Sequence, residues 1–152
     1  MMGGRGSASS GAAKQYAAAY AKPKELVMPK LIGSEKQKKW ANDIIRDPYM
    51  TLSGNSDAAL KTARRYIDIG AGKQLDPASM RRAEVFAAAR DTYAESIEKL
   101  QSAHPEGIKA SWIIEHKGQF AGNAQKALDI EFQKRKKSRA DYANDTGYRL
   151  QR

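Results

Sequence analysis

The sequence has 152 residues, no cysteine and a formal net charge of +10 at pH 7. This length suits one domain that buries a core without a metal or disulfide, and the missing cysteines exclude thiolate nucleophiles and sulfur-based zinc sites. No apolar run approaches the ~18 residues of a membrane span, and the first residues lack the apolar stretch of a secretory signal. We therefore expect a cytoplasmic protein that does not enter the membrane.

Residues 1–30 are predicted to form a flexible basic arm, because they carry five basic side chains against one acidic one. Positions 3–13 are small and polar, and they cannot bury enough surface to order a backbone. An alanine-rich stretch at 14–22 favours a short helix that the following proline ends. The apolar residues of 26–32 are interrupted by a proline, which favours an extended strap on the core over a sheet strand.

The first core helix has the clearest start signal in the chain. Ser34 is a favoured N-cap residue, and Gln37 stands at the capping-box spacing from it. Apolar residues then recur on one helical stripe, namely Trp40, Ala41, Ile44 and Ile45. Trp40 and Trp112 are interpreted as core anchors, because buried aromatic residues dominate small cores. Asp47-Pro48 is predicted to end this helix.

The next two helices are placed by caps and by apolar spacing. One is predicted from residue 56 or 57 to 70, with Leu60, Ala63, Tyr66 and Ile67 facing inward. The other begins at the Asp76 N-cap, has Pro77 in its first position and ends near residue 102. Its inward residues are predicted to be Met80, Ala83, Phe86 or Ala87, Tyr93, Ile97 and Leu100.

Two shorter helices complete the predicted core. After a break at 104–107, a short helix around Trp112 is predicted to end at Gly118. A last helix from about residue 122 to 133 carries an apolar residue every fourth position. Because no alternation long enough for a sheet appears, the predicted fold is all-α, a single compact bundle of about five helices.

The basic residues are concentrated at the two ends of the chain. Residues 31–133 hold 15 basic and 14 acidic side chains, whereas residues 134–152 hold seven basic and two acidic ones. This distribution indicates a folded helical core at 31–133 between a basic N-terminal arm at 1–30 and a basic C-terminal tail at 134–152.

The sequence offers no catalytic or metal-binding constellation. The glycines of 69–74 lack the Walker spacing and follow a predicted helix, so a helix end and turn is preferred. His104 and His116 have no third ligand arranged around them, and Glu115-His116 is interpreted as a surface pair. The acidic residues of the third helix alternate with basic ones, which indicates a solvated face. We therefore expect neither enzyme activity nor a cofactor nor a bound metal.

The strongest functional feature is the basic run that follows residue 133. Crowded cations repel one another in a lone helix, and an anionic partner relieves that repulsion. The alternative interpretation is a tail that only aids solubility. The candidate nucleic-acid-binding residues of this run are Lys134, Arg135, Lys136, Lys137 and Arg139. A second candidate patch on the first core helix consists of Lys36, Lys38 and Lys39.

The start of the first core helix carries a family resemblance. Gly33-Ser34-Glu35-Lys36-Gln37 followed by Trp40-Ala41 resembles the Gly-Ser-x-Lys-Gln-x-x-Trp-Ala helix start of small, uncharacterised phage and mobile-element proteins. Ala110-Ser111-Trp112-Ile113 is similar to a stretch that ends the unit in many of them. Lys38 and Lys39 depart from the residues usual in such helices. The resemblance implies a bacterial host cytoplasm and no particular activity.

Three functions remain open on this evidence. The first is a non-catalytic phage or mobile-element accessory protein that binds the backbone of RNA or DNA, or a host nucleoprotein, through basic segments. The second is an inhibitor of a bacterial defence system, similar to anti-CRISPR proteins, that binds a protein or ribonucleoprotein. The third is a structural or scaffolding protein of the virion. The oligomeric state and the choice between RNA and DNA are not determined by the sequence.

Overall fold

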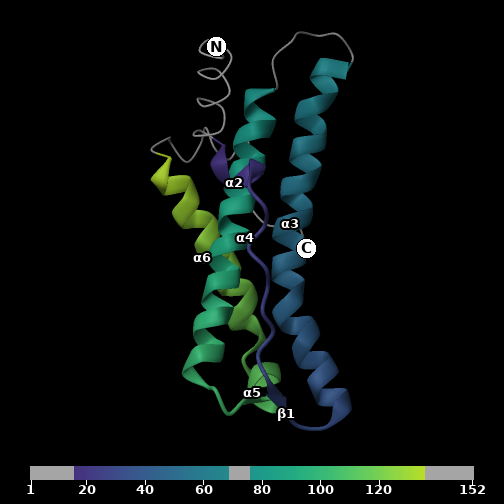
Figure 1. Cartoon of the computed structure of the whole chain (residues 1–152), viewed down its shortest axis with the longest axis vertical. Coiled ribbons are helices and arrows are strands. Elements are labelled where there is room, and N and C mark those ends of the chain that lie inside the picture. Colours follow the sequence, from purple (N-terminus) through teal and green to yellow (C-terminus); the bar gives the residue numbers. More distant parts are fainter. Residues whose placement is uncertain (1–15, 69–75, 136–152) are drawn as a thin grey trace, which may run out of the picture.

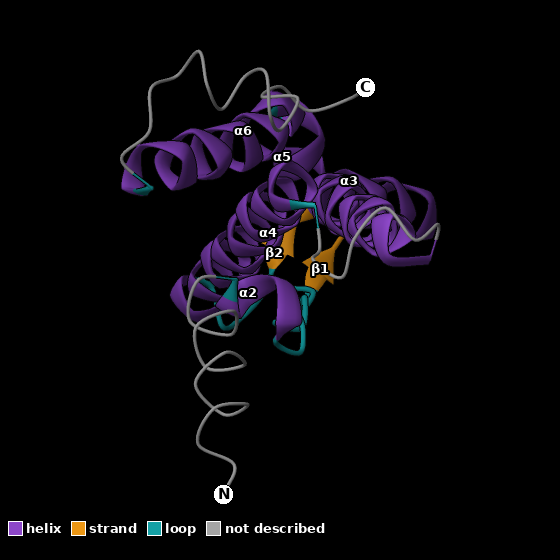
Figure 2. Ribbon diagram, turned by 90° about the horizontal axis from the view of Figure 1, so that it is seen from above, coloured by secondary structure: helices purple, strands orange, loops and turns teal. Residues whose placement is uncertain are grey.

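A computed structural model describes residues 16–68 and 76–135, with the backbone alone for 65–68. The elements, in chain order, are α2 (Ala17–Tyr20), β1 (Leu31–Ile32), α3 (Glu35–Asp68), α4 (Pro77–Ala103), β2 (Ile108–Lys109), α5 (Ala110–Glu115) and α6 (Lys117–Lys134). Figure 1 shows α3 and α4 side by side along the bundle, and Figure 2 shows α2 and α6 on different sides of α4. The predicted helical bundle is therefore confirmed.

The long helix α3 corrects the prediction of two helices separated by Asp47-Pro48. Pro48 lies inside α3, which continues to Asp68. A proline in a helix leaves the carbonyl of the fourth preceding residue without its amide donor and opens that turn. That carbonyl belongs to Ile44, and the Tyr93 hydroxyl of α4 donates a 2.6 Å hydrogen bond to the next carbonyl oxygen, that of Ile45. Tertiary packing against α4 therefore compensates for a local signal that would end an isolated helix.

The capping signals, in contrast, are confirmed. The Gln37 amide donates to Ser34 Oγ at 3.2 Å, and the Ser34 amide donates to Gln37 Oε1 at 3.3 Å. Asp76 caps α4 by accepting the amide of Ser79 at 3.3 Å. Local side-chain chemistry thus determines where α3 and α4 begin, since a cap satisfies amides that the first turn leaves free.

The core lies where α4 meets α3, α5 and α6. The inward stripes predicted for α4 and α6 are buried, apart from a partly buried Leu100. Tyr93 is 1% exposed, and burial raises the pKa of its hydroxyl far above the ordinary range of tyrosine. In α3, Ala41, Ile45 and Ala63 are buried, whereas Ile44 and Leu60 are partly buried. The side chains of Tyr66 and Ile67 lie outside the described part of the chain.

An extended segment, residues 21–30, connects α2 to β1 and is called the strap. It runs along α3 and α4 (Figure 1) and is bonded to both helices. The Lys24 amide donates to Asp91 Oδ1 on α4 at 3.1 Å, and the Tyr49 hydroxyl on α3 donates to the Lys24 carbonyl oxygen at 2.7 Å. Burial raises the pKa of Tyr49. Leu26 and Met28 pack partly buried against the core, so the predicted strap is confirmed up to residue 30, but the prediction is wrong for Leu31–Ile32, which form a sheet strand.

A short parallel pairing of β1 with β2 was not predicted. Leu31 pairs with Ile108 and Ile32 with Lys109. Gly107 precedes β2 with φ +115°, and a side chain there would lie 3.1 Å from Ile32 Cδ1, so glycine allows the close approach of the two strands. Two-residue strands carry too short a pattern for sequence alternation to reveal them.

The C-terminal helices also start and end differently from the prediction. The short helix α5 ends at Glu115, and α6 begins at Lys117 and continues through Gly118 and Gly122. Glycine lowers helix propensity by about 1 kcal/mol, and burial of Phe120 and Ala124 against the core outweighs that cost. Across the described residues, no helix combines the length and apolarity that crossing a bilayer requires.

Candidate nucleic-acid interface

Two of the predicted binding residues at the C-terminal run take part in internal ion pairs. Arg135 Nη1 donates to Glu131 Oε1 at 2.7 Å, and Arg135 Nη2 donates to Glu84 Oε2 at 2.9 Å. Lys134 Nζ lies 3.4 Å from Glu131 Oε2. The guanidinium of Arg135 therefore joins the end of α6 to α4 and has few donors left for a phosphate. Lys136, Lys137 and Arg139 lie outside the described residues.

The prediction that the charged residues of α4 form a solvated face holds for Glu95, Glu98 and Lys99, which are exposed, and is wrong for Glu84 and Arg90. Glu84 and Arg90 are only 7% and 3% exposed. Glu84 also accepts the Ala19 amide of α2 at 2.9 Å, so one carboxylate links α4 to α2 and to Arg135 at the end of α6. Arg90 Nε donates to Asp91 Oδ1 at 2.9 Å. These residues stabilise the packing of the bundle, because buried charges need partners.

The second predicted patch lies on the first turns of α3. Lys36 and Lys39 are exposed, whereas Lys38 Nζ lies 3.0 Å from Glu35 Oε1. An exposed pair of this kind contributes little stability, so an anionic partner can displace it at small cost. The first turns of α3, which carry all three lysines, stand at the end of the bundle that holds β1 and α5 (Figure 1).

We call this end the ladder end and define it as residues 30–40 together with 104–117. The two segments meet, because a side chain at Gly33 would lie 3.4 Å from the Ala110 Cβ atom. They carry six lysines and three glutamates, a net charge of +3 with neutral histidines. The lysines are Lys30, Lys36, Lys38, Lys39, Lys109 and Lys117. The ladder end thus adds a basic surface to the folded body.

Large apolar side chains are exposed among these lysines. Trp40 is 51% exposed, Ile32 is 47% exposed and Trp112 is 38% exposed. The interpretation of both tryptophans as core anchors is therefore wrong. In α3 the stripe that packs inward begins at Ala41, one residue later, and Trp40 turns outward. Aromatic rings interspersed with cations are typical of surfaces that bind single-stranded nucleic acid.

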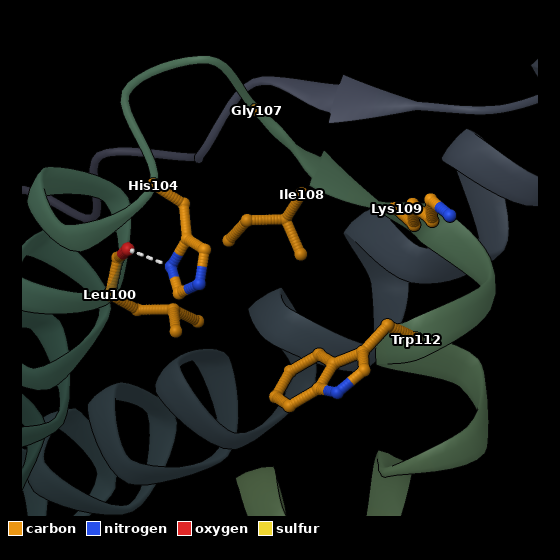
Figure 3. Close-up of a pocket in the computed structure, with 6 residues that line it drawn as sticks. All are labelled: Leu100, His104, Gly107, Ile108, Lys109 and Trp112. Carbon is orange, nitrogen blue, oxygen red and sulfur yellow. Dashed lines mark hydrogen bonds between the residues drawn. The ribbon is translucent and has the colours of Figure 1, made fainter.

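A cavity of about 220 Å³ opens at the ladder end and is drawn in Figure 3. Its lining consists of Leu100, His104, Gly107, Ile108, Lys109 and Trp112. The Trp112 ring stacks on His116 with ring centroids 4.4 Å apart and an interplanar angle of 24°. The imidazole of His116 is held by a 2.7 Å bond between its Nδ1 and the Trp112 carbonyl oxygen. The indole is thus fixed before any ligand arrives.

The two histidines have structural partners of their own. His104 Nδ1 lies 3.1 Å from the Leu100 carbonyl oxygen, and His116 stacks on Trp112, whereas the sequence predicted a surface pair with Glu115. In the described ranges 16–68 and 76–135, no three His, Asp or Glu side chains gather in a way that could hold a metal ion. The glycine-containing stretch 69–74 lies outside those ranges.

No protein-family model, curated protein or solved structure matches this chain.

Proposed function

We propose that this protein is a non-catalytic accessory protein of a phage or mobile element that associates with nucleic acid. The ladder end supplies the main contact surface, and the cationic residues of 136–152 add to it. The contacts go chiefly to the phosphate backbone, because lysines neutralise phosphates and release their counterions. The observation that carries the proposal is the exposure of Trp40 and Trp112 among six lysines at one end of the bundle.

The ion pairs of Arg135 and Lys134 change the contribution expected from the C-terminal run. Arg135 is held by two buried carboxylates, so it serves the fold and leaves phosphate binding to residues elsewhere. Lys136, Lys137 and Arg139 remain candidate phosphate contacts. A deletion that tests them must therefore start at residue 136 and keep Arg135 in the chain.

The test is the salt dependence of binding to a fluorescently labelled single-stranded oligonucleotide. The variant K39Q/K109Q removes one exposed lysine from each segment of the ladder end, and K61Q/K126Q removes two exposed lysines from the far part of α3 and from α6. The ladder-end variant should lower the slope of log Kd against log salt by about 1.4, since each lost single-strand contact contributes about 0.7. The control variant should keep the slope of the unmodified protein.

Deleting residues 136–152 should weaken binding further without changing the fold, which circular dichroism checks. If K39Q/K109Q and K61Q/K126Q lowered the salt slope equally, the net charge of the protein, and not the ladder end, would attract the nucleic acid. An unmodified protein that does not bind single strands or duplexes at low salt contradicts the proposal altogether.

A protein or ribonucleoprotein of a host defence system is the second candidate partner, as for an inhibitor similar to anti-CRISPR proteins. The exposed side chain of Ile32 favours it, because phosphates offer nothing to an apolar group whereas protein interfaces bury such groups. This alternative predicts capture of one host effector that survives nuclease treatment and depends little on salt. The substitution I32S should abolish that capture and leave oligonucleotide binding unchanged.

A further inference from the structure

The cavity at the ladder end has the volume for one planar ring system. Its volume of about 220 Å³ falls below the ~300–1,000 Å³ typical of sites for drug-sized ligands. Leu100 and Ile108 give it apolar walls, and Trp112 gives it an aromatic one (Figure 3). An apolar, partly aromatic cleft at the surface suits a flat group that stacks and loses water on entering.

His104 places a hydrogen-bond acceptor in this apolar cavity. A carbonyl oxygen only accepts, so the 3.1 Å contact with the Leu100 carbonyl oxygen requires a proton on His104 Nδ1. In the neutral ring the other nitrogen, Nε2, then carries a lone pair. Figure 3 shows this nitrogen turned away from Leu100 O, toward the side of the cavity where Ile108 and Trp112 lie. The cavity therefore accepts a hydrogen bond from a ligand that carries an N–H group.

Lys109 adds a positive charge at the rim. It follows Ile108 in β2, and while Ile108 is buried, Lys109 is exposed and still lines the opening. The same end of the bundle carries the exposed lysines of α3. A ligand with a planar N–H-bearing ring and a neighbouring phosphate would satisfy the aromatic wall, the acceptor and the cation together.

We propose that this cavity binds an unpaired nucleobase of a single strand. The base lies against Trp112, one of its Watson–Crick-edge N–H groups donates to His104 Nε2, and Lys109 pairs with an adjacent phosphate. Each of the four bases carries an N–H donor on that edge, and in a duplex the donor is already paired. The cavity therefore selects single strands over duplexes and does not read sequence. This inference rests on the proposed function, because it specifies that the nucleic acid bound at the ladder end is single-stranded.

Tryptophan fluorescence of the full chain tests the proposal. In the W40F background Trp112 is the one remaining tryptophan. A single-stranded adenine oligonucleotide should quench its emission, a duplex of the same length should leave it unchanged, and adenosine monophosphate should act only at far higher concentration. Replacing Trp112 with alanine should weaken single-strand binding roughly 5- to 150-fold, the range for loss of one stacked base. The matched substitution W40A should weaken it less.

His104 gives a second variant that does not depend on Trp112. Because His104 is exposed, H104A leaves the core intact, and we expect it to reduce the preference for single strands over duplexes. If single strands and duplexes bind alike, with W112A and H104A both neutral, the cavity proposal is overturned while the proposed function stands. If neither nucleic acid binds at low salt, the proposed function fails as well. Adenosine monophosphate that binds as tightly as the oligonucleotide would assign the cavity to a free nucleotide and overturn the single-strand assignment.

Discussion

Replacing Arg135 with alanine removes the cation that two buried carboxylates share. The side chains of Glu84 and Glu131 are 9% and 7% exposed, and each accepts a bond from the guanidinium, at 2.9 and 2.7 Å. Removing one partner of a buried ion pair costs about 3–5 kcal/mol. The Arg135 side chain is 21% exposed, so water can reach the vacated site and part of this cost is relieved. We expect R135A to lower the free energy of unfolding by about 2–4 kcal/mol.

Urea unfolding followed by far-ultraviolet circular dichroism measures this loss. The matched control is K134A, which removes a neighbouring cation whose side chain is 65% exposed and which should cost less than about 1 kcal/mol. In the R135A protein, the further substitution E84Q keeps an oxygen for the Ala19 amide and removes the unpaired carboxylate charge. The double variant should therefore be more stable than R135A alone. An R135A protein as stable as K134A would refute the assignment of Arg135 to the fold.

Other predictions concern the bundle itself. Y93F removes the 2.6 Å bond to the Ile45 carbonyl oxygen and should cost about 1–2 kcal/mol in urea unfolding at neutral pH; no loss would mean that α3 does not need this bond near Pro48. Burial raises the pKa of Tyr93 in the folded state, so its contribution is complete below the unfolded pKa of about 10 and is lost as the pH rises above that value. Y93F should therefore lose stability less steeply in alkali than the unmodified protein, and equal slopes would argue against a buried, neutral hydroxyl. G107A should destabilise the protein by about 1–3 kcal/mol, because φ is +115° and Ile32 lies in the path of the new methyl group. G54A, at a helical glycine with open space around it, should stabilise the protein by up to about 1 kcal/mol. Thermal unfolding compares G107A with G54A. If both variants were destabilised, the available space around each glycine would not explain the effects.

Sequence reasoning succeeded where a short segment carries its own physical signal. The Ser34–Gln37 box and the Asp76 cap are local hydrogen-bonding devices, and both are present as predicted. The apolar spacing of α6 likewise placed Ala124, Leu128 and Phe132 in the core. These signals depend on residues within a few positions of one another, so the sequence displays them directly.

The incorrect predictions concern features that depend on distant partners. Pro48 favours the end of an isolated helix, but α3, which packs against α4 and accepts a bond from Tyr93, continues through it. Trp40 fits the apolar spacing of the sequence, yet the stripe that is buried in the fold begins one residue later, at Ala41.

The candidate site depends even more on tertiary structure. Glu84 lies 51 residues before Arg135, and no local pattern connects them. The cavity between Trp112 and His104 likewise forms only when the end of α4, β2 and α5 come together. The lysines of α3 could be identified from the sequence, whereas the aromatic residues beside them could be recognised as exposed only from the fold.

Photo-crosslinking tests the central claim most directly, because it identifies the residues that touch the nucleic acid. The unmodified protein is irradiated with a single strand that contains 4-thiouridine at one position, and mass spectrometry locates the crosslinked peptides. We predict that crosslinks concentrate in 30–40 and 104–117, with Trp112 among the modified residues. A complex that forms while both segments remain free of crosslinks would contradict the assignment of the nucleic-acid interface to the ladder end.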